Sequence, residues 1–230
     1  MDLTSTIGVV PDGFHPPLEE YLEAIHELEE EGVAVIQARL AERLEHSPPS
    51  VSEMVRRLKS DGYVAVKGRE VQLTEKGRAR AESVVRKHRL AERLLTDVIG
   101  LPWSKAHVEA CRWEHVISDE VEDRLVTLLG NPSTCPHGNP IPGAGAVQDD
   151  LVALGDLEPG TALRLERVTE QVELDGEALE YLDDHGFVPG ATALVRSKGP
   201  DGTVTVALDG GSIALGPALA QQLYVAVAVG

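Results

Sequence analysis

The sequence predicts a mainly helical protein with some β structure: an N-terminal winged helix-turn-helix, a helical middle part and a small C-terminal β-barrel. Three observations support this prediction. Two short amphipathic stretches, 35–45 and 50–61, flank a Pro-containing turn and precede two β-like runs around 67–69. Longer stretches with helical spacing follow up to residue 129. From about residue 151, short alternating segments separated by Gly, Asp and Pro indicate the strands of a barrel.

The N-terminal segment combines a tail with one amphipathic helix. Residues 1–17 contain Gly and Pro without periodicity, so we expect a flexible tail. A helix then begins at Pro17, ends at Gly32 and has apolar residues at helical spacing on one face. The opposite face carries the carboxylates of Glu19, Glu20, Glu23 and Glu27. A solvated surface is the simplest interpretation of any one of these residues.

The stretch 50–61 is the candidate recognition helix, which would enter the major groove. We expect Ser50 to cap it, with Glu53 as capping-box partner. Residues 33–80 hold ten basic and six acidic residues, and this local positive charge favours DNA over the alternative, a winged helix that binds protein. The side chains expected at the DNA surface are Arg39, Ser47, Pro49, Ser50, Ser52, Glu53, Arg56, Lys59, Lys67 and Arg69.

Residues 86–118 carry side chains that suit a divalent metal. The pattern predicts two helices broken at 100–102, with His88 and Glu92 four apart on the first. The second carries His107, Cys111, Glu114 and His115, and the last three share one face. Imidazole, carboxylate and thiolate together suit Fe²⁺, Mn²⁺, Co²⁺, Ni²⁺ or Zn²⁺ better than Mg²⁺ or Ca²⁺. The alternative is a core helix with a buried cysteine, although unpaired buried charge is costly.

The last hundred residues differ in composition from the rest. Residues 131–145 are rich in Pro and Gly, which predicts a linker, extended in part. Cys135 and His137 lie inside it, and on the residues alone an ordinary loop is favoured over ligation. Residues 140–230 hold four basic and fourteen acidic residues, so this part is not expected to contact DNA. The predicted strands are 161–168, 191–196, 203–208, 212–215 and 224–229, with short helices at 177–185 and 217–222.

The composition excludes several classes of protein. A chain of 230 residues can bury a core as one or two domains. Two cysteines are too few for a disulfide scaffold and fit a reducing compartment. The sequence shows no signal-like start and no apolar run near twenty residues, so we expect a cytoplasmic protein without membrane contact. The net charge of −17 argues against nucleic acid only as an average, because basic residues concentrate near the N-terminus.

Taken together, these features resemble the diphtheria-toxin-repressor and iron-dependent-regulator family of metal-activated bacterial repressors, which includes manganese regulators. The resemblance is carried by YLEAIHELEEEG at 21–32, RKHRLAERLL at 86–95, EACRWEHV at 109–116, SDEVE at 118–122 and GNPIPG at 138–143. It implies a DNA-binding domain at 18–80, a helical dimerisation and metal-binding domain at 81–143, a linker at 144–150 and an SH3-like, FeoA-like domain at 151–230. The expected protein is a homodimeric repressor of operator DNA, not an enzyme, with two dimers per operator as a further possibility.

The resemblance also implies two metal sites. The regulatory site would consist of Glu20, Cys111, Glu114 and His115, with Glu23 as a further candidate. The ancillary site would consist of His88, Glu92, His107, Glu170 and Glu173, with Cys135 and His137 as further candidates that resemble a second-site pair in some manganese members. The sequence departs from the iron-type members at Glu20, where these have Met, and at Glu173, where these have Gln.

The resemblance leaves the metal open between Mn²⁺ and Fe²⁺. A carboxylate at Glu20 favours Mn²⁺, whereas the thiolate of Cys111 favours Fe²⁺ and softer ions. We expect Mn²⁺ as the slightly favoured co-repressor, Fe²⁺ as the alternative, and Co²⁺, Ni²⁺ and Zn²⁺ as substitutes in vitro. The competing classes are a metalloenzyme and a metal-binding scaffold whose winged helix does not bind DNA, but no acid, base or nucleophile beyond the ligands supports an enzyme.

Overall fold

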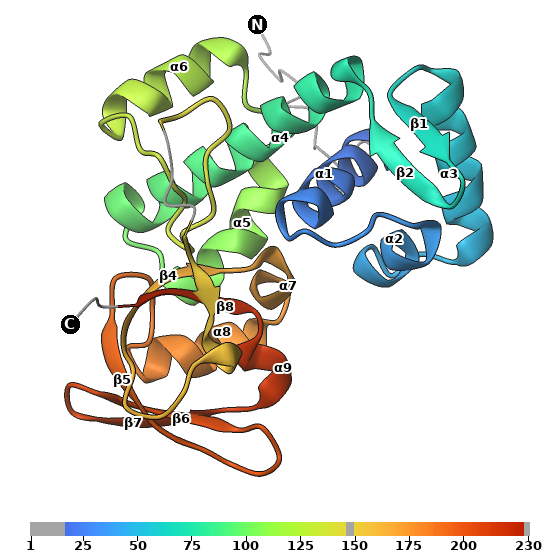
Figure 1. The fold of residues 1–230 in the computed structure, drawn as a ribbon. Helices are drawn as coiled ribbons and strands as arrows, with labels where there is room; N and C mark the ends of the chain where they lie inside the picture. The colour runs from blue at the N-terminus through green and yellow to red at the C-terminus, as the bar shows by residue number, and fades with distance from the viewer. Residues whose placement is uncertain (1–16, 146–149, 228–230) are drawn as a thin grey trace, which may run out of the picture.

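The computed structural model describes residues 17–145 and 150–227, which form three connected parts (Figure 1). A winged helix is followed by a helical part and then by a domain built around an antiparallel sheet, so the predicted fold class is confirmed. The expected tail at 1–16 and residues 146–149 of the expected linker lie outside the described residues. None of the described helices is long and apolar enough to cross a membrane.

The winged helix consists of α1 Pro17–Glu30, α2 Gln37–Arg43, α3 Pro48–Ser60, β1 Val64–Lys67 and β2 Glu70–Leu73. The two strands pair antiparallel, with Val66 opposite Val71. Leu22, Leu40 and Leu58 join α1, α2 and α3 in one core and have no exposed surface. Burying each of them stabilises the fold by about 2 kcal/mol. This core packs α3 and the hairpin against α1.

The start of α3 differs from the prediction. Pro48 is the first residue of the helix, and the Ser47 hydroxyl accepts a hydrogen bond from the Ser50 amide at 3.4 Å. The expected cap at Ser50 with Glu53 as its partner is therefore wrong, because Ser50 already lies inside the helix. Proline at the first helical position lacks an amide hydrogen that would need a partner, so Ser47-Pro48 is a good helix start.

The helical part consists of α4 Glu75–Arg93, a π-helical turn Leu94–Ile99, a 3-10 turn Trp103–Lys105, α5 Ala106–Trp113 and α6 Asp119–Leu128. The predicted helix that ends at Ile99 is thus α-helical only to Arg93. The second predicted helix ends at Trp113, so Glu114 and His115 lie in the turn that follows it. Glu114 still donates its amide to Ala110 at 3.1 Å, which keeps it on the face that the helical spacing predicts.

The helical part exposes several large apolar side chains to the outside. Between 46% and 63% of each is exposed in Val98, Ile99, Val108, Val121 and Leu128. A group of exposed apolar side chains on one part of a molecule marks an interaction surface. This surface fits the dimerisation role that the resemblance implies for this part.

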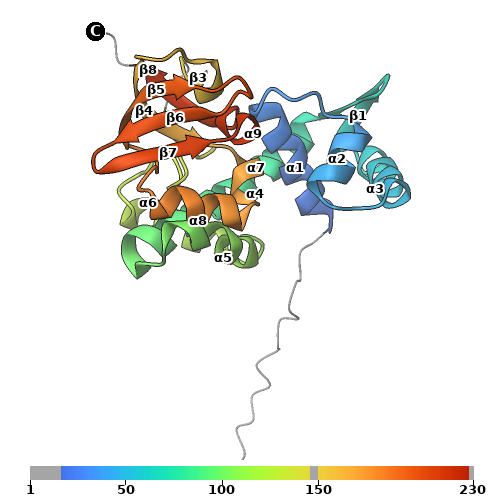
Figure 2. The ribbon, with the colours of Figure 1, turned by 90° about the horizontal axis from the view of Figure 1, so that it is seen from below.

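The C-terminal domain is a six-stranded antiparallel sheet of order β3-β8-β4-β5-β6-β7 with short helices. Its elements are β3 Val152–Ala153, a 3-10 turn Leu154–Asp156, β4 Ala162–Val168, α7 Glu170–Glu173, α8 Gly176–Asp184, β5 Thr192–Lys198, β6 Val204–Leu208, β7 Gly211–Leu215, α9 Pro217–Ala220 and β8 Leu223–Val227. All five predicted strands are present, while β3 and α7 were not predicted. In Figure 2, α7 and α9 lie on the side of this domain that faces α1.

The Pro- and Gly-rich segment 131–145 is packed between the helical part and the sheet, which its composition did not predict. Residues 135–139 are all buried. His137 accepts a backbone hydrogen bond from the Val168 amide at 2.8 Å, and the Asn139 side chain donates to the Val168 carbonyl at 2.8 Å. A Cβ at Gly138, whose φ is +91°, would lie 1.9 Å from the Glu166 carbonyl oxygen. The segment therefore fixes β4 and α7 against α4 and α5.

Candidate metal centre

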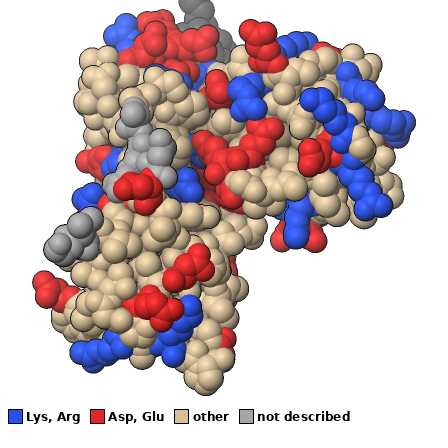
Figure 3. All heavy atoms as spheres, viewed as in Figure 1, with Lys and Arg blue, Asp and Glu red and all other residues tan. Residues whose placement is uncertain are grey.

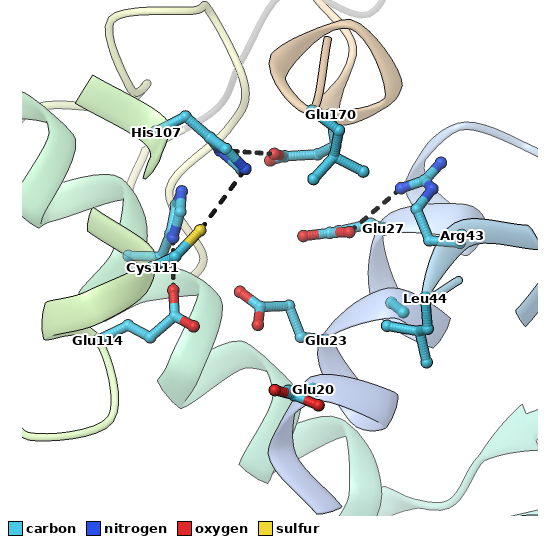
Figure 4. Close-up of a pocket in the computed structure, with 12 residues that line it drawn as sticks. Glu20, Glu23, Glu27, Arg43, Leu44, His107, Cys111, Glu114 and Glu170 are labelled. Atoms are coloured by element: carbon cyan, nitrogen blue, oxygen red, sulfur yellow. Dashed lines mark hydrogen bonds and ion pairs between the residues drawn. The ribbon is translucent and has the colours of Figure 1, made fainter. Parts of the chain in front are cut away.

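A cavity of about 260 Å³ lies where α1, α4, α5 and α7 meet (Figure 4). Its lining residues come from all three parts of the chain: Glu20, Glu23, Ala24, Glu27, Arg43, Leu44, His88, His107, Cys111, Glu114, Glu170 and Leu174. A group that binds here therefore touches the DNA-binding part, the helical part and the sheet domain at once. In Figure 3, acidic side chains gather at this joint, whereas Lys and Arg are concentrated over the winged helix.

Helix α1 turns its acidic face toward this cavity. Glu20, Glu23 and Glu27 are spaced three and four apart and therefore share a face. Leu22 and Ile25 lie on the opposite face and are completely buried in the winged-helix core. The acidic face thus lies in a joint between domains, against the simplest interpretation from the sequence, a solvated surface.

Three side chains from three helices or their ends form what we call the outer cluster: Glu23, His88 and Glu114. One potential ligand atom from each lies within 4.8 Å of the others. His88 Nδ1 is 2.5 Å from Glu114 Oε2, and Glu114 Oε1 is 3.0 Å from His115 Nε2. His115 Nδ1 in turn lies 2.7 Å from Glu19 Oε2 on α1. The cluster thus connects α1 to α4 and to the end of α5.

A second group, which we call the inner cluster, consists of Glu92, Cys135 and His137, and its potential ligand atoms also lie within 4.8 Å of one another. Glu92 Oε1 is 3.1 Å from His137 Nδ1 and 3.2 Å from His88 Nε2. Glu173 extends the cluster, because its Oε2 atom is 2.9 Å from His137 Nδ1. All these residues are buried.

His88 and His107 lie between the two clusters. Together they form one potential ligand group with Cys111 and another with Glu170 and Glu173. Cys111 Sγ is 3.6 Å from His107 Nε2, and His107 Nδ1 is 3.1 Å from Glu173 Oε2. His88 uses one ring nitrogen toward each cluster, so it can serve either one.

Buried atoms without hydrogen-bond partners show that this region fits a metal ion. Among the described residues, such atoms include His88 Nε2, both Glu92 oxygens, His137 Nδ1 and Glu170 Oε2. These atoms lie close to one another, but their contacts lack hydrogen-bond geometry. An unsatisfied buried polar group costs about 1–3 kcal/mol. A divalent cation with nitrogen, oxygen and sulfur donors would satisfy them together, and the donor set suits a transition metal.

Two of the potential ligands are held in place by further side chains. Asn139 Nδ2 donates to Glu173 Oε1 at 2.5 Å, and the fully buried Arg89 donates to Glu170 Oε1 at 2.9 Å. Arg89 also pairs with Glu30 of α1 at 2.6 Å and donates to the Pro140 carbonyl. Partners of this kind fix the orientation of metal ligands.

The protonation of the inner cluster shows how its charge is balanced. Burial lowers the pKa of His137, but the carboxylates of Glu173 and Glu92 outweigh it and raise that pKa well above its usual value. Burial raises the pKa of Cys135, and the same two carboxylates bring it to about 12. Without a metal, the imidazolium therefore carries the positive charge and the thiol keeps its proton. A metal ion that binds here has to displace these protons.

The two carboxyl groups of the outer cluster titrate in opposite directions. Burial raises the pKa of Glu114, but the charges and hydrogen bonds of His88 and His115 lower it to about 2. Burial and the charge of Glu114 raise the pKa of Glu23 well above its usual value. Burial and the charge of Glu170 likewise raise the pKa of Glu27 to about 8. The α1 side thus carries more carboxylates than the nearby cations can neutralise.

Two residues of the expected regulatory site belong to different potential ligand groups: Glu114 to the outer cluster, and Cys111 to the group with His88 and His107. Glu114 belongs to the outer cluster together with Glu23, the further candidate, and Glu20 lines the same cavity. Cys111 points toward His107 (Figure 4). His115 bridges Glu114 and Glu19. The assignment of these side chains to one metal ion stays a prediction.

The residues expected at the ancillary site come together more completely. The structure brings together His88, Glu92, His107, Glu170, Glu173, Cys135 and His137. Cys135 and His137, which the residues alone did not favour as ligands, are thus part of the same region. Every one of them is buried. Their joint ligation of a metal stays a prediction, but the structure brings all of them within one group of overlapping clusters.

Two charged residues of the cavity, Glu27 and Arg43, were not singled out from the sequence as functional. Glu27 lies four residues after Glu23 on the same face of α1, and this spacing was a usable signal. Arg43 on α2 gave no such signal, because its approach to α1 depends on the tertiary structure. Its guanidinium is 2.6 Å from Glu31 Oε2 and 3.2 Å from Glu27 Oε2.

The side chains expected at the DNA surface are accessible on the winged helix. Ser52 is half-buried and the others are exposed: Arg39, Ser47, Pro49, Ser50, Glu53, Arg56, Lys59, Lys67 and Arg69. They come from α2, the start and outer face of α3, and the hairpin tip. Arg39 is paired with Glu42 at 2.7 Å, an exposed contact that a phosphate can replace at little cost.

Comparisons with known proteins agree with this arrangement. Residues 14–70 match the N-terminal DNA-binding domain of the iron-dependent repressors, residues 74–143 match their metal-binding and dimerisation domain, and residues 152–227 match the FeoA domain. The chain is 50% identical to the iron-dependent repressor IdeR of Mycobacterium tuberculosis over 204 residues, which is 84% of this chain and 88% of that protein. It is 43% identical to the diphtheria toxin repressor of Corynebacterium diphtheriae over 217 residues, 90% of this chain and 95% of that protein.

Solved structures give the same result. A manganese-dependent transcriptional repressor in complex with manganese matches with a TM-score of 0.83 and 31% identity over 92% of this chain and all of that chain. The structure of ScaR with bound Zn²⁺ matches with a TM-score of 0.77 and 30% identity over 92% of this chain and 99% of that chain. These relatives are repressors and not enzymes, and the matched domains indicate DNA and a second copy of the chain as partners. The chain therefore belongs to the diphtheria-toxin-repressor and iron-dependent-repressor family of metal-dependent transcriptional repressors.

Proposed function

We propose that a divalent ion in the outer cluster activates this repressor by holding α1 against α4 and α5. The observation that carries the proposal is the convergence of Glu23, His88 and Glu114, from the DNA-binding part and the helical core, on one point of the cavity. The ion adds positive charge beside Glu23, whose pKa burial and the charge of Glu114 raise well above its usual value. It favours the DNA-binding state only to the extent that it binds that state more tightly, and a tenfold preference corresponds to about 1.4 kcal/mol.

The proposed co-repressor is Mn²⁺, with Fe²⁺ as the alternative. Two of the three side chains of the outer cluster are carboxylates, and Glu20 lines the same cavity, which favours a hard ion. Cys111 Sγ lies 3.6 Å from His107 Nε2, so we assign its soft sulfur to the potential ligand group with His88 and His107. The 50% identity to an iron-dependent repressor supports Fe²⁺, and the 31% identity to a manganese-dependent one supports Mn²⁺.

The inner cluster, together with His107, Glu170 and Glu173, is the proposed ancillary site. Both Glu92 oxygens and Nδ1 of His137 lack a hydrogen bond although they are buried, and this supports the proposal. An ion here would tie segment 131–145 and α7 to α4. Its proposed role is structural, because it joins elements that already pack against one another.

The proposed DNA complex is a homodimer whose two α3 helices enter successive major grooves. The exposed basic side chains of α3 and of the hairpin tip, among them Arg56, Lys59, Lys67 and Arg69, support phosphate contacts. Two dimers on one operator is the further arrangement that we propose to test by stoichiometry. The exposed apolar side chains of the helical part supply the dimer surface.

The test uses duplexes selected from a random pool by binding in the presence of Mn²⁺. Fluorescence anisotropy then measures the affinity of the wild-type chain with Mn²⁺, with anaerobic Fe²⁺ and with chelator. We expect Glu114→Gln to weaken metal-dependent DNA binding by at least about 100-fold, since even the outer partners of a metal contribute about 10–100-fold. Glu109→Gln on the same helix, where Glu109 contacts Arg112 and Trp113, is the control. Wild-type affinity of the Glu114 variant in Mn²⁺ contradicts the proposal.

A further inference from the structure

The first helix of the helix-turn-helix reaches the metal cavity at its C-terminal end, where Arg43 and the capping residue Leu44 line it, and Arg43 is the charged one of the two. It is the last residue of α2, and only 4% of its side chain is exposed. Its guanidinium spans two carboxylates at the C-terminal end of α1, with Nη1 3.2 Å from Oε2 of Glu27 inside the helix and Nη2 2.6 Å from Oε2 of Glu31, the residue directly after it. Arg43 and Glu27 both line the cavity (Figure 4). Arg43 is therefore a physical connection between the cavity and the DNA-binding unit.

The two carboxylates that hold Arg43 differ in their distance from the outer cluster. Glu27 lies one helical turn after Glu23, so its side chain neighbours a ligand of the outer cluster. Glu31 follows a further turn along the chain, away from it. A divalent ion at the outer cluster attracts the Glu27 carboxylate and repels the Arg43 guanidinium, whereas its effect on the more distant Glu31 pair is weaker.

We propose that Arg43 is a positioning residue that transmits occupancy of the outer cluster to α2 by changing its partners on α1. Without the ion, Arg43 holds both Glu27 and Glu31. With the ion, Glu27 turns toward the metal, and Arg43 keeps Glu31 as its main partner. Because α2 and α3 pack together with α1 in one core, a shift at the end of α2 relative to α1 also changes the position of the recognition helix. This inference rests on the proposed metal activation and adds the residue that carries the signal.

The proposal predicts opposite effects of one substitution on two affinities. Arg43→Gln removes a positive charge that opposes the ion, so Mn²⁺ binding to the outer cluster should tighten about tenfold. The same substitution removes the ion pairs between the end of α2 and the end of α1, so DNA affinity at saturating Mn²⁺ should fall about tenfold. A residue with a purely structural role would not tighten metal binding when it is removed.

Two further variants make this test specific. Arg78→Gln is the matched control, because Arg78 also pairs with a carboxylate of α1, Glu29, at 2.7 Å, but does not line the cavity. It should leave Mn²⁺ affinity within about twofold of wild type. Arg43→Lys keeps the charge but cannot span two carboxylates as a planar guanidinium does. It should retain wild-type Mn²⁺ affinity and lose several-fold in DNA affinity.

Isothermal titration with Mn²⁺ and anisotropy with the selected duplex, both on the full-length dimer, provide the readouts. Circular dichroism verifies the fold of each variant, and Arg43→Lys carries the test if Arg43→Gln does not fold. Equal Mn²⁺ affinities of Arg43→Gln and Arg78→Gln overturn the inference, as does wild-type DNA affinity of Arg43→Lys. Wild-type protein that binds no Mn²⁺, or that binds DNA equally with and without it, overturns the proposed function instead.

Discussion

The outer and inner clusters use the same kinds of side chain but are built differently. The outer cluster lies at a cavity of about 260 Å³ and takes Glu23 from a helix of the DNA-binding part. The inner cluster is closed, and its members come from α4 and from the buried segment 135–139. The outer cluster thus joins the DNA-binding part to the helical part, whereas the inner one lies within a packed junction.

The two clusters also differ in how far basic side chains balance their acidic ones. In the inner cluster the acids are balanced by imidazoles, since Glu173 and Glu92 raise the pKa of His137 well above its usual value. On the α1 side, acids outnumber cations, and burial with the charge of Glu170 raises the pKa of Glu27 to about 8. A metal ion displaces protons at both clusters, from an imidazolium and a thiol at the inner one and from the carboxyl groups of α1 at the outer one. Because the outer cluster includes a residue of the DNA-binding part, we propose switching as its role and stabilisation as the role of the inner cluster.

The largest expected effect is that of His88→Gln, because His88 faces both clusters. Its Nδ1 is 2.5 Å from Glu114 and its Nε2 is 3.2 Å from Glu92. We expect metal affinity at both sites to fall by at least about 100-fold. Equilibrium dialysis with metal analysis measures the stoichiometry, and His185→Gln, which removes an exposed histidine, is the control. Retention of one tightly bound ion would show that the two clusters do not share this ligand.

A second prediction separates the clusters by pH. The pKa values of His88, His107 and His137 are raised well above the usual range, by carboxylates for His88 and His137 and by Cys111 for His107, against the effect of burial. These imidazoles are protonated at neutral pH without a metal, so binding releases protons and affinity rises with pH. Each released proton contributes up to about tenfold per pH unit.

The inner cluster should show the steeper pH dependence between pH 6 and 8. The imidazole of His137 and the thiol of Cys135 both hold protons that the ion must displace. In the outer cluster, Glu114 has a pKa of about 2 and needs no deprotonation, so only Glu23, whose pKa is raised by burial and by Glu114, adds a proton to that of the shared His88. Titration calorimetry in buffers with different ionisation enthalpies counts the protons released by each ion. Equal proton counts at the two sites would remove this distinction.

A third prediction disturbs the inner cluster without changing a ligand. Gly138→Ala would place a Cβ 1.9 Å from the Glu166 carbonyl oxygen at a φ of +91°, so segment 131–145 must move away from β4. We expect the ancillary metal to bind about tenfold more weakly and the outer cluster to bind normally. Gly143→Ala is the control, since Gly143 has a φ of +73° but its Cβ would meet only the end of the Arg86 side chain, at 3.4 Å. An equal loss in both variants would mean that backbone strain alone causes the effect.

The sequence was most informative where function depends on local spacing. His88 and Glu92 are four apart, and so are His107 and Cys111, and a helix necessarily brings each pair together. The helix-turn-helix could be predicted for the same reason, although the structure places the cap of its second helix at Ser47 and not at the expected Ser50. The resemblance to a known family then supplied the connection between α1 and residues about ninety positions later.

The sequence was least informative where a contact joins distant segments. Segment 131–145 looked like a linker because its composition is that of one, but its burial depends on hydrogen bonds between Asn139 and β4 and on the close approach of Gly138. Arg43 was one basic residue among ten in its region, and nothing local distinguishes it from Arg39. Periodicity defines the face of a helix but does not identify the element that will cover that face.

The smallest expected effect concerns the two cysteines and sharpens the comparison by metal type. Burial raises the pKa of Cys111, but His107 and His88 outweigh this effect and lower it, whereas burial, Glu92 and Glu173 raise the pKa of Cys135 to about 12. A hard ion such as Mn²⁺ gains little from a thiolate that is costly to form, so Cys135→Ser should weaken Mn²⁺ binding only about twofold to threefold. Zn²⁺ displaces a thiol proton more readily, so the same variant should lose considerably more Zn²⁺ affinity. Competition with a zinc-sensitive dye measures both, and a larger loss for Mn²⁺ than for Zn²⁺ would exclude Cys135 as a ligand of the ancillary ion.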